Sequence, residues 1–113
     1  YKNSIELVIA NNDAMALGAI DAYEKLGVTE SNVPAFFGVD GTDDGLEAVQ
    51  QSKLAATVYN DKEGQARAMA QLAYLAATGG SMKNIKFEDK KYVYLPYEKV
   101  THDNVNEFVK DEQ

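Results

Sequence analysis

The chain has 113 residues, about the size of one domain, and 45% of them are hydrophobic, which is enough for a core and too many for a disordered chain. Lys and Arg number 11 against 18 Asp and Glu, and the net charge of -7 argues against binding to nucleic acid or to an anionic membrane, which both need clustered cations. Cysteine is absent, which excludes disulfides and zinc–thiolate sites, and no apolar run approaches the roughly 20 residues of a membrane-spanning helix, so we expect no membrane insertion.

A strand and a helix are predicted at the start of the chain. Residues 5–10 form a short apolar run that ends at polar side chains, as a buried strand does. The next helix is expected over 14–26, with Asn12 or Asp13 as its N-cap, because their side-chain oxygens accept the free amides of a first helical turn. Most of its surface is apolar, so we expect this helix to be buried against a sheet.

The rest of the chain continues the alternation of strands and helices. Strands that alternate with helices are parallel and are joined by helical crossovers. The predicted fold class is therefore α/β, with an open doubly wound, mostly parallel sheet. Because a parallel sheet needs cover on both faces, we expect this thin sheet to rely on another segment or on a partner. The further elements expected are strands over 34–40, 54–59 and 91–97 and helices over 43–51, 63–77 and 102–109.

Polar side chains stand at the ends of three predicted strands. Asn12, Asp40 and Asn60 follow the first, second and third strand. In open α/β sheets, ligands bind at the carboxyl ends of the strands, where the loops diverge. Asn donates and accepts hydrogen bonds and Asp accepts them, which suits the neighbouring hydroxyls of a sugar better than phosphate, which binds to Lys, Arg or backbone amides. The same residue types are also ordinary helix caps and turn formers, and that alternative stays open.

Other chemistries have weaker support. The run from Asp40 to Gly45 begins like a calcium loop, but Gln51 stands where the bidentate glutamate is needed. Asp13, Asp40 and Asp61 imitate the acidic cluster of a magnesium-dependent phosphotransfer domain, but no lysine is well placed beside a phosphoryl group. No glycine-rich nucleotide motif occurs. A small α/β enzyme or receiver-like domain therefore ranks behind a ligand-binding module.

Several motifs resemble one protein family. The segment VIANNDAMALGA from Val8 to Ala19 closely resembles the second lobe of bacterial galactose/glucose-binding proteins, and GVD at 38–40, VYND at 58–61 and VYLPY at 93–97 follow in that family's order and spacing. The chain thus resembles the type I periplasmic binding proteins over nearly its whole length. The resemblance implies two α/β lobes that close on a monosaccharide, here D-galactose or D-glucose. It also implies a protein without enzymatic activity that delivers sugar to the membrane subunits of an ABC importer, and in some bacteria to a chemoreceptor.

The resemblance also assigns roles to single residues. It implies that Asn12 and Asn60 hydrogen-bond sugar hydroxyls and that Asp40 accepts from them. It implies that Glu6 completes a calcium site whose loop lies upstream, so calcium is expected only in a longer parent protein and no other cofactor is required. The alternative for Glu6 is a solvent-facing residue on an edge strand. The implied location is the periplasm, or the outside of the cell with a lipid anchor.

Members of this family are much longer than the present chain, which we expect to be their C-terminal part. Residues 1–60 would then be βα units of the second lobe, 61–90 a helix that returns to the first lobe, and 91–113 the final strand and helix. We expect the chain to accompany the upstream part or to associate with itself, and to bind sugar weakly or not at all when it is alone. The effector-binding core of lactose-repressor-type transcription regulators shares the fold and is the alternative, although Asn11-Asn12 and the VYND segment favour the transport protein.

Overall fold

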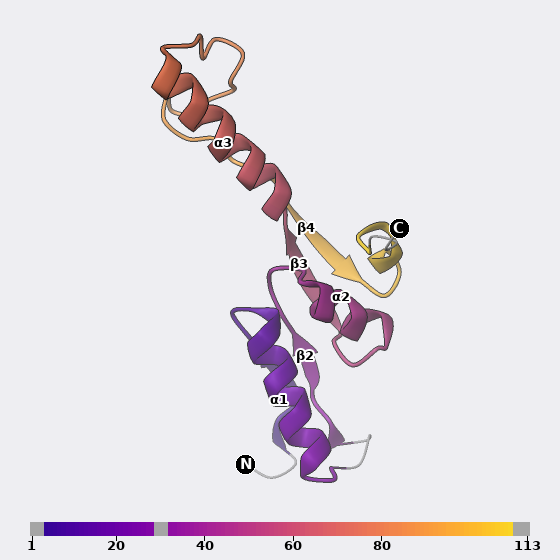
Figure 1. The fold of residues 1–113 in the computed structure, drawn as a ribbon. Helices are drawn as coiled ribbons and strands as arrows, with labels where there is room; N and C mark the ends of the chain where they lie inside the picture. The colour runs from indigo at the N-terminus through magenta and orange to yellow at the C-terminus, as the bar shows by residue number, and fades with distance from the viewer. Residues whose placement is uncertain (1–3, 29–31, 110–113) are drawn as a thin grey trace. The chain divides into compact units, whose positions relative to one another are not determined.

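The computed structural model describes residues 4–28 and 32–109. The chain folds as two compact units, one made of Tyr1–Asn60 with Glu98–Gln113 and the other of Asp61–Tyr97. The first unit holds the sheet and all three predicted sugar-binding residues. Its elements in chain order are β1 (Leu7–Ile9), α1 (Asp13–Lys25), β2 (Ala35–Phe37), α2 (Asp43–Gln50), β3 (Ala56–Asn60), β4 (Tyr97–Thr101) and the 3-10 helix η3 (Val105–Glu107), with β4 crossing the boundary between the units (Figure 1).

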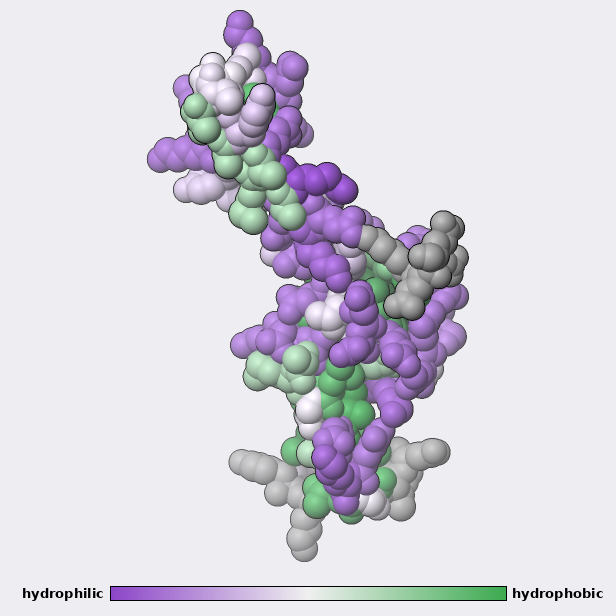
Figure 2. Space-filling view, in the orientation of Figure 1, coloured by the Kyte–Doolittle hydropathy of each residue, from purple (hydrophilic) through white to green (hydrophobic). Residues whose placement is uncertain are grey.

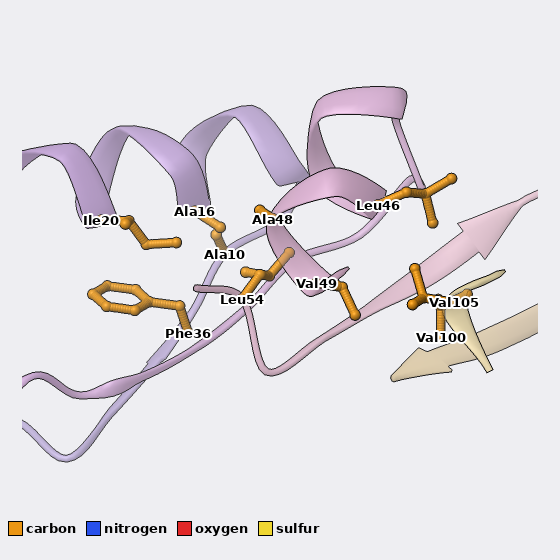
Figure 3. Close-up of a cluster of buried hydrophobic side chains, with 10 residues drawn as sticks. All are labelled: Ala10, Ala16, Ile20, Phe36, Leu46, Ala48, Val49, Leu54, Val100 and Val105. Atoms are coloured by element: carbon orange, nitrogen blue, oxygen red, sulfur yellow. The ribbon is translucent and has the colours of Figure 1, made fainter. Parts of the chain in front are cut away.

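The sheet is open and mostly parallel, as predicted. Its strand order is β1-β2-β3-β4. β1 pairs in parallel with β2, with Val8 opposite Phe36, and β2 pairs in parallel with β3, with Phe37 opposite Ala56. The arrow of β4 points opposite to that of β3 in Figure 3. Because each crossover joins neighbouring strands in the same sense, right-handed connections place α1 and α2 on one face of the sheet.

The core of this unit lies between the two helices and the sheet. The rings of Tyr23 and Phe36 pack edge to face, with centroids 5.6 Å apart. Val100 of β4 is fully buried, so the last strand belongs to the same core. The buried hydrophobic side chains are Ala10, Ala16, Ile20, Phe36, Leu46, Ala48, Val49, Leu54, Val100 and Val105 (Figure 3).

α1 packs against the sheet, as predicted, but it buries only one stripe of its surface. Within this helix only Asp13, Ala16 and Ile20 are buried, and Met15 is 57% exposed. The physical reason is that a small sheet with helices on one face covers a single stripe of each helix. Figure 2 shows hydrophobic residues on the visible surface of this unit, in the region where Figure 1 draws β2.

The second unit is built on α3 (Lys62–Thr78). Asp61 caps this helix by accepting from the N–H of Gly64 at 2.9 Å, and Gly79 ends it with a φ of 65°, a backbone conformation that favours glycine. No residue of α3 is buried. Its return to a first lobe stays a prediction. Nowhere in 4–28 or 32–109 does a helix have both the length and the apolarity that crossing a membrane requires.

The end of the chain differs from the prediction. The strand expected over 91–97 is wrong: before β4 begins at Tyr97, the pairing in this stretch is that of Tyr92 in an isolated antiparallel bridge with Glu88. In place of the helix expected over 102–109, the structure has the three-residue 3-10 helix η3. The Oδ1 atom of Asn104 accepts from the N–H of Thr101 at 2.8 Å, a local bond that competes with helix formation in a segment too short to be stable as an isolated helix.

Candidate functional site

The carboxyl ends of β1, β2 and β3 lie side by side. The N–H of Asp13 donates to the carbonyl of Val39 at 2.7 Å, which places Asn12 and Asp40 on adjacent segments. The N–H of Asn60 donates to the carbonyl of Asp40 at 3.1 Å. The backbone therefore aligns the three predicted residues along one edge of the sheet.

Asn12 is a helix cap, and its side chain also has a second polar atom. Its Oδ1 atom accepts from the N–H of Met15 at 2.8 Å, so the residue is the N-cap of α1. Its side chain is half-buried, and no described residue accepts a hydrogen bond from its Nδ2 atom. The oxygen of the amide thus caps α1, and its Nδ2 atom is a hydrogen-bond donor at the carboxyl end of β1.

Asp40 adopts a backbone conformation that L-residues rarely take. Its φ is 110°, and its N–H donates to the carbonyl of Val58 at 2.9 Å. No described residue donates to its half-buried carboxylate. Strained backbone of this kind is concentrated at functional sites, where the surrounding structure holds it in place.

Gly41 allows the chain to turn directly after Asp40. Its φ is 64°, and a Cβ atom there would lie 2.6 Å from Cδ2 of Tyr59, a distance that real Cβ atoms do not reach. The loop after β2 therefore passes close over β3, which brings Asp40 toward the end of that strand. Asn60 is half-buried at this point.

Asp13 is the residue whose role the sequence analysis missed. It was expected only as an alternative cap or as one acid of a phosphotransfer cluster. Its side chain is fully buried, and its Oδ1 atom accepts from Oγ1 of Thr57 at 2.6 Å. Its Oδ2 atom accepts from the N–H of Thr42 at 2.8 Å and from the Oγ1 atom of the same residue at 3.2 Å. Two threonines far along the sequence thus satisfy this carboxylate, and no local pattern marks them.

The described residues do not assemble a metal centre. Within 4–28 and 32–109, no three His, Asp or Glu side chains are placed to hold a metal ion. Glu6 is exposed, and its carbonyl accepts from the N–H of Ala35 at 3.0 Å. One carboxylate does not make a calcium site, which takes about six to eight oxygen ligands. The segment from Asp40 to Gly45 is a turn and helix start, because Thr42 caps α2 by accepting from the N–H of Gly45 at 3.1 Å.

A hollow of about 630 Å³ lies at the other end of the sheet. Its lining includes Tyr23, Pro34 and Lys53, which surround the amino ends of β2 and β3. None of the three polar strand-end residues lines this hollow. The candidate site is therefore the row of Asn12, Asp40 and Asn60 at the carboxyl ends.

The chain belongs to a family of binding proteins. The family described as "Periplasmic binding protein domain" matches residues 1–81, and the chain is a member of it. This family consists of binding proteins and not of enzymes, as the sequence predicted.

Known relatives extend the similarity over almost the whole chain. The D-galactose/methyl-galactoside binding periplasmic protein MglB of Haemophilus influenzae is 40% identical over 96% of this chain and 32% of its own length. The ribose import binding protein RbsB of Escherichia coli is 46% identical over 48% of this chain and 17% of its own. An ABC transporter solute binding protein from Bacillus halodurans, solved with bound myo-inositol, aligns with a TM-score of 0.77 and 40% identity over 93% of this chain and 33% of its own. The present chain thus spans about a third of the first of these relatives.

Proposed function

We propose that this chain is the C-terminal third of a two-lobe sugar-binding protein that serves an ABC importer. The bound sugar in this proposal is D-galactose or D-glucose, and the location is the periplasm or, with a lipid anchor, the outside of the cell. The galactose-binding relative, 40% identical over nearly the whole chain, supports this choice. The ribose-binding and inositol-bound relatives support the broader class of polyhydroxylated ligands. Delivery to a chemoreceptor belongs to the same proposal.

The observation that carries the proposal is the row of polar groups at the carboxyl ends of β1, β2 and β3. It combines the Nδ2 donor of Asn12 with the acceptor oxygens of Asp40, neither of which is used within the described residues, and it ends at Asn60. Side chains on adjacent strands are about 4.8 Å apart, which matches hydroxyls on non-adjacent carbons of a sugar ring. Each hydroxyl donates and accepts, so an alternation of amide and carboxylate groups suits it.

Binding in this arrangement needs hydrogen bonding and the exclusion of water. The Asn12 amide donates to one hydroxyl oxygen, and the Asp40 carboxylate accepts from a second hydroxyl. Asn60 meets a third hydroxyl from the neighbouring strand. A second lobe that closes over this edge removes water and strengthens each of these bonds.

The other parts of the proposal concern the whole protein. Residues 1–60 form βα units of the second lobe, α3 within 61–90 returns to the first lobe, and 91–113 close the second lobe. Glu6 supplies one ligand to a calcium site that residues upstream complete. Its exposed position directly before β1, which stands at the end of the sheet order, leaves its carboxylate accessible to such ligands.

Titration calorimetry on the complete protein tests the proposal. D-galactose, D-glucose, D-ribose and myo-inositol are titrated into the wild type and into Asn12→Ala, Asp40→Ala and Asn60→Ala. Each variant is expected to bind the preferred sugar about tenfold or more weakly, since a lost partner for a buried polar group costs about 1–3 kcal/mol. Asn106→Ala is the matched control, because this exposed asparagine contacts Gln50 far from the strand ends.

Two outcomes contradict the proposal. Unchanged affinity in all three alanine variants refutes the site. A wild type that binds none of the four ligands refutes the function. In that case a helix-turn-helix upstream of the chain and binding to operator DNA would identify the repressor-type alternative.

A further inference from the structure

Asp13 and Thr57 are the buried polar side chains of the first unit. Among the described residues of the chain, these are the two buried polar residues, with exposed fractions of 0% and 1%. Thr57 donates to Asp13 at 2.6 Å, the length of a hydrogen bond between a hydroxyl and a carboxylate. A carboxylate is costly to bury, so a protein that buries one needs every oxygen to be satisfied.

The network around Asp13 reaches all three strand ends of the candidate site. Asp13 directly follows Asn12, and its Oδ1 atom accepts from the hydroxyl of Thr57, which stands in β3 three residues before Asn60. The same hydroxyl accepts from the N–H of Gly41, which directly follows Asp40, at 3.4 Å. One carboxylate therefore ties the segments that carry the three candidate ligands.

The carboxylate is also enclosed by backbone. A Cβ atom on Gly38 would overlap Oδ1 of Asp13, and a Cβ atom on Gly45 would overlap Oδ2. Two glycines thus leave the space that the carboxylate fills, and little room remains for it to move. A buried polar network that is fully satisfied is rigid and fixes one arrangement of the groups it connects.

We propose that Asp13, acting through Thr57, is a positioning residue of the sugar site. It touches no sugar. It holds the ends of β1, β2 and β3 in the register that lets Asn12, Asp40 and Asn60 meet one sugar ring. This inference rests on the proposed function, and it adds that affinity depends on a buried carboxylate–hydroxyl bond beneath the site.

A pair of substitutions at Thr57 tests the inference in the complete protein. Thr57→Val keeps the shape but removes the hydroxyl, and Thr57→Ser keeps the hydroxyl but removes the methyl group. We expect Thr57→Val to bind sugar about tenfold more weakly, and Thr57→Ser to restore most of that affinity. Ile20→Ala, a core truncation in α1 beside the hollow at the amino ends of the strands, is the control for lost stability alone and is expected to keep wild-type affinity. Affinity is measured by calorimetry at a temperature where every variant is folded.

A second readout does not depend on sugar. The N–H groups of Asp13 and Asn60 bond across the strand ends, and their hydrogen exchange in the unliganded protein is expected to accelerate in Thr57→Val and to recover in Thr57→Ser. If exchange responds in this way but the wild type binds no sugar, the proposed function fails and the positioning of the strand ends stands. Wild-type affinity in Thr57→Val, or an equal loss in Ile20→Ala, overturns the inference.

A milder variant covers the case in which Thr57→Val does not fold. Thr42→Ala removes a hydroxyl that lies 3.2 Å from Oδ2 of Asp13 and also caps α2, but it keeps the backbone N–H that donates to Asp13 at 2.8 Å. We expect a smaller loss of affinity, about two- to threefold, with faster exchange at the Asp13 amide. Affinity and exchange equal to the wild type would overturn the inference.

Discussion

The N–H of Asn60 donates to the carbonyl of Asp40 at 3.1 Å, and this bond joins the last residue of β3 to a residue whose φ is 110°. The N–H of Asp40 donates in turn to Val58 of the same strand. The ladder between β2 and β3 thus continues past the regular strand and holds Asp40 in a strained conformation. An aspartate in this conformation lowers the stability of the fold, and it places a carboxylate at the candidate site.

Stability and sugar affinity are therefore expected to change in opposite directions in Asp40→Gly. Glycine adopts a φ of 110° without a Cβ clash, so the free energy of unfolding should rise by about 1 kcal/mol, while the lost carboxylate weakens sugar binding about tenfold. Asp40→Ala loses the same affinity without the gain in stability. Denaturant unfolding and calorimetry on the complete protein measure the two effects.

Ser52→Gly separates strain relief from binding. Ser52 has a φ of 59° just after α2 and lies away from the candidate site, so this variant should gain stability and keep its affinity. An Asp40→Gly variant that is less stable than Asp40→Ala would show that the conformation of residue 40 is not strained.

At Asn12, helix capping and sugar binding are expected to separate. Asn12→Ser keeps an oxygen for the N–H of Met15 and so keeps the cap, whereas Asn12→Ala loses the cap and about 1 kcal/mol of unfolding free energy. Both variants lose the Nδ2 donor, and both should bind sugar about tenfold more weakly. A serine variant with wild-type affinity would mean that Asn12 is a cap and nothing more.

Much of the first unit was predictable because its signals are local. The polar residues after each apolar run mark the strand ends, and the rule that ligands bind at the carboxyl ends of parallel strands selects Asn12, Asp40 and Asn60. The cap at Asn12 also follows from its residue type. Gly79, after the last residue of α3, is an equally local stop signal.

The features that the sequence did not predict depend on distant contacts. Asp13 is satisfied by Thr57, 44 residues along the chain, and nothing near Asp13 indicates that partner. Likewise, Tyr92 and Tyr94 alternate as in a strand, but a strand needs a neighbour to pair with, and here their rings pack against each other at 5.8 Å outside the regular sheet. Whether a segment has a pairing strand, or a buried side chain a partner, depends on the three-dimensional fold. A short sequence pattern does not contain that information.

Two glycine-to-alanine substitutions in helices are expected to have opposite effects. Alanine normally stabilises a helix by up to about 1 kcal/mol relative to glycine. Gly18→Ala in α1 should show this gain, because no atom beyond its chain neighbours and the helix's own backbone lies within 4 Å of the new Cβ. Gly45→Ala in α2 should instead lose about 1–3 kcal/mol, because its Cβ would overlap Oδ2 of Asp13. Equilibrium unfolding measures both, and equal gains would show that the Asp13 carboxylate is free to move.

An apolar face of β1 leads to the last prediction, which concerns the 113-residue chain by itself. Val8 packs toward the core, while Leu7 and Ile9 on either side of it are 52% and 73% exposed. β1 also ends the sheet order, so its outer edge has no paired strand among the described residues. An exposed apolar edge strand favours pairing with another chain.

We therefore expect this chain alone to associate with itself and Ile9→Lys to lower its average mass, since a charge on this face is costly to bury. Leu26→Lys is the control, because Leu26 is 76% exposed but lies at the end of α1. Sedimentation velocity measures the distribution of masses. A wild-type chain that stays monomeric and unfolds cooperatively would contradict the prediction. In the complete protein, we expect another segment to cover this face of the sheet, so Ile9→Lys should instead lower the free energy of unfolding and leave the protein monomeric.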